Sequence, residues 1–435
     1  MKLVKNFRIL PLQVVHILHD CVRFPEACSF GKKALASLKS FEDDCLEDIL
    51  NLKQSVAGVL NSQGEYEEAY KIYTYVYDKF TSIFDSNDRR ILETRHNIAQ
   101  TLQYLGKYEK AYKEFKETLD KKQHYLGDDD EDTLLTKRCI ALVLIDLGNY
   151  KEALLMCADL PTGGLQDCNN YAVILDRCGD YGKAKQFYQD VLERKIKTFG
   201  EKHLSTVTTK HNLAGLLHIL GELNQAFEMY KEVLEVRKEH LNAAHRDICA
   251  TEINMAMVLD DQGKYKDALS KYEEVLSKQT ATLGSYHPDS LTTMNNKGVV
   301  LEKLRRYDEA SEVYQHVLVQ RCLILGEEHP DTLITRNNIA VVKETKGQYE
   351  EAFNEHTDIY NLKRKTLGEN HLSTLTSQNN LASVLESQQK YDEALNLYED
   401  VFKRRTEKFC TFIVIPESGH LMTIQCKVSV MSECV

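Results

Sequence analysis

The chain has 435 residues, with six prolines and no tryptophan, which is typical of a helix-rich protein. Its formal net charge of −11 argues against a nucleic-acid partner, because phosphate binding needs clustered lysine and arginine. No stretch approaches the roughly 20 apolar residues of a membrane span, and twelve cysteines without a CxxC pair indicate reduced thiols, so we expect a cytoplasmic protein without membrane insertion.

A short motif recurs along the chain and defines its units. Gly-x-Tyr-x-x-Ala starts at Gly64, Gly106, Gly148, Gly179, Gly263 and Gly347, with degenerate copies at Gly221, Arg305 and Gln389. Successive starts are 42 residues apart, except for one interval of 31 between Gly148 and Gly179. A further copy starts at Val22. We therefore expect an N-terminal helical segment over 1–21, part of an incomplete first unit, and a repeat array over 22–406.

Each unit is predicted to be a pair of helices. The sequence Leu-Gly-x-x-His-Pro, intact at Leu325, precedes a helix expected to end at Gly347, because glycine tolerates the positive φ of a helix end. The second helix then begins near Tyr349, and the small Ala352 lets the two helices approach closely. An aromatic residue follows this alanine position by four, and these rings should fill the gap between helices: Tyr73, Phe115, Tyr188, Tyr230, Tyr272, Tyr314 and Tyr398.

Two segments depart from the pattern. The unit around 150–178 is interrupted at Pro161–Gly164, and its second helix is expected to be shorter by about three turns. Residues 407–435 form an atypical C-terminal tail with strand-like runs and no helical period. We assign this tail no function.

Taken together, these motifs resemble the 42-residue tetratricopeptide repeats of kinesin light chains and nephrocystin-type proteins, in which NNLA, GKYEEA and LGxxHP recur in this order. The resemblance covers roughly residues 22–406. It implies an all-α fold, a right-handed superhelical solenoid of tetratricopeptide helix pairs with a concave and a convex face. It also implies a protein that binds other proteins rather than an enzyme.

The first helix of successive units carries an asparagine at one position. This asparagine row comprises Asn97, Asn170, Asn212, Asn254, Asn296, Asn338 and Asn380, and Cys139 interrupts it. Because helix propensity does not favour asparagine, its repeated use suggests a side-chain role. The resemblance implies a peptide-binding groove in which the amides hold the backbone of an extended partner segment. The alternative is that the amides bridge adjacent helices within the solenoid.

A second row lies six residues further along the same helices. This acidic edge comprises Asp176, Asp260, Glu302, Glu344 and Glu386, with His218 in the remaining position. An acidic edge favours a basic or polar partner segment. The alternative is a solvated charged face on an acidic protein.

No feature of the sequence predicts a metal site, a cofactor or catalytic residues. Histidines recur 42 residues apart before the first helices, too far apart to share one ion, and are expected to be helix-start residues: His203, His245, His287, His329 and His371. The acidic run 127–133 lacks the ligand pattern of a calcium loop and should instead stabilise a helix N-terminus. Phosphate-loop, nucleophile-elbow and metalloprotease motifs are absent from the sequence.

The sequence therefore predicts a non-enzymatic scaffold or adaptor that binds a protein or peptide segment, basic or polar in character. One alternative is the sensor part of a multidomain signalling ATPase-type protein. Another is a light-chain-like cargo adaptor of a microtubule motor, which needs a long heptad coiled coil that residues 1–21 are too short to provide. A third is a structural homo-oligomer that stacks through its ends.

Overall fold

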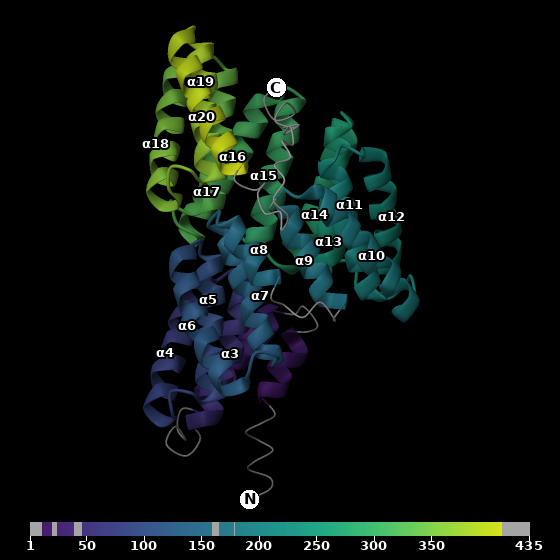
Figure 1. Cartoon of the computed structure of the whole chain (residues 1–435), viewed down its shortest axis with the longest axis vertical. Helices are drawn as coiled ribbons and strands as arrows, with labels where there is room; N and C mark the ends of the chain where they lie inside the picture. The colour runs from purple at the N-terminus through teal and green to yellow at the C-terminus, as the bar shows by residue number, and fades with distance from the viewer. Residues whose placement is uncertain (1–10, 20–23, 39–45, 159–164, 178, 411–435) are drawn as a thin grey trace, which may run out of the picture. The chain divides into compact units, whose positions relative to one another are not determined.

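The computed structural model describes residues 11–19, 24–38, 46–158, 165–177 and 179–410, and every regular element in this part of the chain is a helix (Figure 1). After a helix over 11–19, the elements are α2 (Phe24–Leu38), α3 (Leu46–Gln63), α4 (Tyr66–Ile83), α5 (Arg89–Tyr104), α6 (Tyr108–Leu126), α7 (Glu131–Asp146), α8 (Tyr150–Ala158), α9 (Leu165–Arg177), α10 (Tyr181–Phe199), α11 (Leu204–Ile219), α12 (Leu223–His240), α13 (Arg246–Asp261), α14 (Tyr265–Thr282), α15 (Pro288–Lys303), α16 (Tyr307–Ile324), α17 (Pro330–Thr345), α18 (Tyr349–Leu367), α19 (Leu372–Ser387) and α20 (Tyr391–Cys410). Consecutive helices pack on one another from α2 to α16 and from α18 to α20, so the predicted all-α solenoid of helix pairs is confirmed.

The turn inside each pair depends on one residue with positive φ. At Gly263 φ is 75°, and the N–H groups of Gly263 and Lys264 bond back to carbonyls at the end of α13, at 2.9 Å each. This satisfies carbonyls that the end of a helix leaves open. In two degenerate copies Arg305 and Gln389 hold the same turn, with φ of 60° and 63°. The turn is therefore kept even where its glycine is lost.

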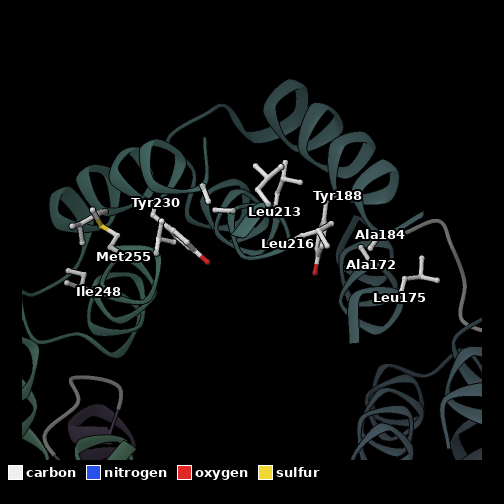
Figure 2. Close-up of a cluster of buried hydrophobic side chains, with 14 residues drawn as sticks. Ala172, Leu175, Ala184, Tyr188, Leu213, Leu216, Tyr230, Ile248 and Met255 are labelled. Carbon is white, nitrogen blue, oxygen red and sulfur yellow. The ribbon is translucent and has the colours of Figure 1, made fainter. Parts of the chain in front are cut away.

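Six of the seven predicted aromatic rings form the core between helices, whereas the seventh, Tyr398 on α20, is only half-buried. Tyr73, Phe115, Tyr188, Tyr230, Tyr272 and Tyr314 are each no more than 3% exposed. Figure 2 shows Tyr188 and Tyr230 among the alanine, leucine and methionine side chains of α9 to α13. Tyr314 packs directly over Gly298, where an added Cβ would lie 2.4 Å from the ring. In α18 the fully buried His356 takes the aromatic position, and neither ring nitrogen has a hydrogen-bond partner among the described residues.

The short unit around 150–178 is described in part. Its second helix, α8, has nine described residues, whereas α6 and α10 have 19 each, and the predicted shortening by about three turns stays a prediction because the residues that follow Ala158 are not described. The interruption at Pro161–Gly164 lies outside the described residues.

The chain divides into two compact units, Met1–Val342 and Lys343–Val435, and the boundary falls within α17. At the C-terminal end, α20 continues through residues 407–410 of the predicted tail, and 411–435 lie outside the described residues.

Candidate interaction site

The asparagine row lies on the first helices, one residue each on α5, α9, α11, α13, α15, α17 and α19. All seven side chains are half-buried, at the boundary between the packed side of the helix and solvent. Four residues before the position of the row, Leu135 on α7 and Ile334 on α17 are exposed. Three residues after it, Leu142 and Met257 are exposed. Residues three and four apart share one face of a helix. The row is therefore part of a face that is both polar and apolar.

Two members of the row bridge neighbouring first helices. The amide of Asn254 on α13 lies 3.2 Å from Nε2 of His211 on α11, and its nitrogen donates to the Tyr230 hydroxyl at 3.2 Å. The amide nitrogen of Asn338 donates to Oδ1 of Asn295 on α15 at 3.3 Å. The contacts of Asn254 with His211 and of Asn338 with Asn295 each join residues 43 positions apart, in neighbouring units. These two amides make the bridges that the alternative interpretation describes.

Three other members have no side-chain partner among the described residues: Asn97, Asn212 and Asn296. The residue 43 positions earlier explains two of these cases. For Asn296 it is Ile253, which offers no polar atom, and for Asn212 it is Asn169, whose oxygen already accepts from Thr209 at 2.9 Å. Asn170 and Asn380 take part in other interactions and are not free. The row thus contains both bridging amides and amides open to an external partner.

Four of the acidic-edge carboxylates interact with the array itself. Asp260 pairs with Lys303 of the next first helix at 2.9 Å. Glu302 accepts from the Tyr314 hydroxyl, and Glu344 accepts from Ser383 at 3.2 Å and Ser387 at 2.6 Å. Glu386 accepts from Tyr398 at 3.2 Å, and His218, in the remaining position, contacts Asp261 at 2.6 Å.

Asp176 is the acidic-edge residue most affected by burial. Burial raises its pKa to about 6, partly offset by the charge of Arg177. Its Oδ1 is buried without a hydrogen-bond partner among the described residues. Hydrogen bonds from tyrosine and serine do not cancel charge, so of this edge only Asp260 is neutralised by a described ion pair.

The recurrent histidines start helices, as predicted. Nδ1 accepts from the main-chain N–H two residues later at 3.1–3.2 Å in His203, His245, His287, His329 and His371. In the acidic run, Asp130 has this capping role and accepts from Asp132 N at 2.9 Å. No group of three or more histidine, cysteine, aspartate or glutamate residues within the described ranges could hold a metal ion. Nor is any helix in those ranges long and apolar enough to cross a membrane.

One cysteine and one histidine lie close together on neighbouring first helices. Sγ of Cys139 lies 3.9 Å from Nε2 of His96. Burial raises the pKa of Cys139 to about 11, and burial followed by the charge of Lys122 lowers the pKa of His96 to about 4. Both groups are thus held neutral at pH 7, whereas a catalytic cysteine needs a stabilised thiolate. The pair lacks the electrostatics of a nucleophile.

The structure contains a row of buried cations that the sequence did not predict. Near the end of the second helix, five units have one basic side chain that is no more than 7% exposed: Lys122, Lys195, Arg237, Arg321 and Lys363. Each donates to the main-chain carbonyl ten residues later, in the first turn of the next first helix, at 2.7–3.4 Å. We call this contact the buried clamp. Its signal was available, because the cations keep the register of the repeat.

The clamp extends to a buried hydroxyl. Arg237 also donates to Thr251 at 2.6 Å, and Arg321 to Thr335 at 2.8 Å. In one unit the uncharged Gln279 takes the cation's place and accepts from Thr293 at 2.7 Å. Burial lowers the pKa of Lys363 to about 8, which measures how strongly the site disfavours charge. In the five units that have the cation, the clamp fastens the second helix to the unit that follows.

Comparison with known proteins agrees with this architecture. The family model described as tetratricopeptide repeat matches residues 46–123, 90–156, 168–239, 247–320 and 331–407. Among solved structures, a Rap protein complexed with Competence and Sporulation Factor is 12% identical over 92% of this chain and 98% of its own, with a TM-score of 0.52, a likeness of fold alone. Repeats of a putative kinesin light chain from Podospora anserina are 26% identical over 47% of this chain and 97% of theirs, with a TM-score of 0.39. The search of curated proteins found no match. The chain belongs to the tetratricopeptide-repeat family.

Proposed function

We propose that this chain is a non-enzymatic interaction scaffold that holds a peptide segment of a partner protein along the asparagine row. The observation that carries the proposal is the division of the row. Asn97, Asn212 and Asn296 are half-buried and have no partner among the described residues. A side-chain amide offers two donors and an acceptor, which complement a peptide group. An extended backbone lying over these amides would satisfy them.

The surroundings of the row support a segment of mixed character. Leu142, Met257 and Ile334 are exposed beside the amides and would bury apolar side chains of the partner. The acidic edge carries more negative than positive charge, so we expect basic or polar residues between those apolar ones. The Rap protein of similar fold was solved in complex with Competence and Sporulation Factor, which is a precedent for ligand binding by a chain of this fold.

Site-specific photo-crosslinking tests the proposal. A photoreactive amino acid replaces Met257, which lies on the face of the row between Asn212 and Asn296, and the full chain is irradiated in a cell extract. We expect a defined protein adduct that falls at least about fivefold in the double variant Asn212→Ala, Asn296→Ala, since each lost amide removes about 0.5–1.5 kcal/mol. The matched control places the same photoreactive group at Leu323, which is 76% exposed on a second helix.

Two results would contradict the proposal. One is the same set of adducts from positions 257 and 323, which would indicate non-specific contact. The other is an adduct at 257 that is unchanged in the double variant, because the amides would then play no part in binding.

A further inference from the structure

Among the described helices, the last one, α20, exposes a stripe that other second helices cover. On α20, Tyr391, Leu395 and Phe402 are 63%, 56% and 59% exposed. Their spacing of four and seven residues places them on one side of the helix. At the corresponding positions of α18, Tyr349 is 38% exposed, and Phe353 and Tyr360 are half-buried. There α19 packs on α18, as α15 packs on α14 and α13 on α12.

The same end of the array holds an incomplete clamp. Arg405 follows Lys363 by one repeat, and Lys363 donates to the carbonyl of Ser373 at 3.4 Å. In an internal unit the clamp cation Arg321 also donates to the hydroxyl of Thr292 on the preceding first helix. Arg405 keeps the equivalent bond, from its Nη2 to Thr376 at 3.4 Å. No described main-chain carbonyl accepts from Arg405, and its Nε is buried without a partner. The clamp cation is in place, but the first helix that it would fasten is not among the described residues.

We propose that this terminal face, formed by Tyr391, Leu395, Phe402 and Arg405, docks one amphipathic helix of another protein. The inference rests on continuity with the internal interfaces, where the equivalent stripe and cation receive the first helix of the next unit. The docked helix has apolar residues at three- and four-residue intervals. It presents a carbonyl of its first turn to Arg405, with a serine or threonine four residues after it, as Asp331 and Thr335 do for Arg321.

The pattern of the chain itself favours an occupant from another protein. In the register of the repeat, the capping histidine of a following first helix would fall at Ile413 and its buried threonine at Gly419. Neither residue supplies the required group. A second copy of the chain is a less suitable occupant, because six of the first helices that the structure describes, α5, α7, α11, α13, α15 and α19, are each packed between helices of their own array. This surface is separate from the asparagine row and does not depend on the proposed function.

Charge around the stripe adds a requirement. Lys403 is exposed next to Phe402, close to the clamp end of α20. In three internal units an acidic residue lies two positions after the capping histidine, near the clamp, as Asp331 does, and in two others this position is a serine. A carboxylate in the first turn of the docked helix also suits the positive end of its helix dipole.

The probe for this surface is a fluorescent synthetic peptide with the sequence of residues 325–346 of this chain, held helical by a lactam bridge on its outward side. It contains the capping histidine, Asp331 and Thr335. Binding to the full chain is measured by fluorescence anisotropy, and hydrogen exchange locates the site. We expect saturable binding with new protection in α20. Phe402→Asp and Leu395→Asp should each weaken binding at least tenfold, and Arg405→Gln about fivefold.

Controls separate the interface from folding and from the asparagine row. Leu323→Asp, at another exposed leucine, and the double variant Asn212→Ala, Asn296→Ala should bind the probe as the unmodified chain does. A probe with Thr335→Val should bind more weakly than the original. Circular dichroism melting of the Phe402→Asp and Leu395→Asp variants verifies that they remain folded, as expected for substitutions at exposed positions.

Three outcomes would overturn the proposal. The first is absence of binding, or binding that Phe402→Asp leaves unchanged. The second is α20 already protected from exchange without the probe and deprotected by Phe402→Asp, which would mean that the chain covers its own face. The third is a concentration-dependent dimer in ultracentrifugation that Phe402→Asp abolishes, which would assign the face to a second copy.

Discussion

Asn254 and Asn296 occupy the same position in neighbouring units, yet their environments differ. Asn254 bridges to His211 and Tyr230, whereas Asn296 has no side-chain partner among the described residues. The difference arises 43 residues earlier, where Asn254 meets a histidine and Asn296 meets Ile253. A repeated residue can therefore bridge two helices in one unit and lack a described side-chain partner in the next. The neighbouring row decides which role each amide has.

Lowering the pH should give the largest loss of stability. It should act where an asparagine of the row bridges to a neighbouring helix. Burial, followed by the charge of Arg237, lowers the pKa of His211 to about 4. The folded state thus binds fewer protons than the unfolded state, so the contribution of this group to stability is complete above about pH 6.5 and is lost as pH falls towards 4. We expect a loss of about 3 kcal/mol from this residue. Urea unfolding at pH 7 and pH 4.5 measures it.

The control for the acid effect is His211→Gln, which removes the titrating group but keeps a hydrogen-bonding side chain. Its free energy of unfolding should depend less on pH than that of the unmodified chain. Buried His96 and His356, whose pKa values burial also lowers to about 4, keep part of the dependence in both proteins. An identical pH dependence with and without His211 would contradict the assignment.

Removing each amide in turn should give the next largest effect. Asn254→Ala leaves the Tyr230 hydroxyl without its described partner and should cost about 1–3 kcal/mol. Asn296→Ala breaks no described hydrogen bond and should change the free energy of unfolding by less than about 0.5 kcal/mol. Both are read from urea midpoints at constant slope. Equal losses would show that the two amides have the same role.

The smallest effect should come from converting one role into the other. Asn338 donates to the side-chain oxygen of Asn295, 43 residues earlier, at 3.3 Å. The substitution Ile253→Asn gives Asn296 an amide at the equivalent position. We expect a new bridge that offsets part of the stability lost with the isoleucine, by about 0.5–1.5 kcal/mol. A double-mutant cycle with Asn296→Ala isolates this coupling energy. A coupling energy of zero would mean that the neighbouring row does not decide the role of the asparagine.

Much of the fold could be predicted from the sequence because the same structural residues recur at fixed intervals. The glycine turn, the capping histidine and the buried aromatic recur in one register, and each has a local physical reason. Arg305 and Gln389 show that this register even identifies turns without glycine. The single 31-residue interval predicts a shorter second helix in its unit, where α8 is described over nine residues.

The interior contacts were harder to predict. The buried clamp joins residues ten and fourteen positions apart, and a basic residue near a helix end is ordinarily interpreted as solvent-exposed. Its burial becomes apparent only when Lys363 is placed against the carbonyl of Ser373. The asparagine row was found, but its division was not, because that division depends on contacts 43 residues apart. Such pairs are side by side only after the helices have stacked.

The most direct test of peptide binding by the asparagine row is an affinity measurement. The segment captured by crosslinking is synthesised, and its dissociation constant is determined by calorimetry for the full chain and for the double variant Asn212→Ala, Asn296→Ala. Two lost amides at about 0.5–1.5 kcal/mol each predict binding weaker by about fivefold or more, with an unchanged urea midpoint. Equal affinity for the two proteins would contradict the account, as would a loss of binding that only accompanies a loss of stability.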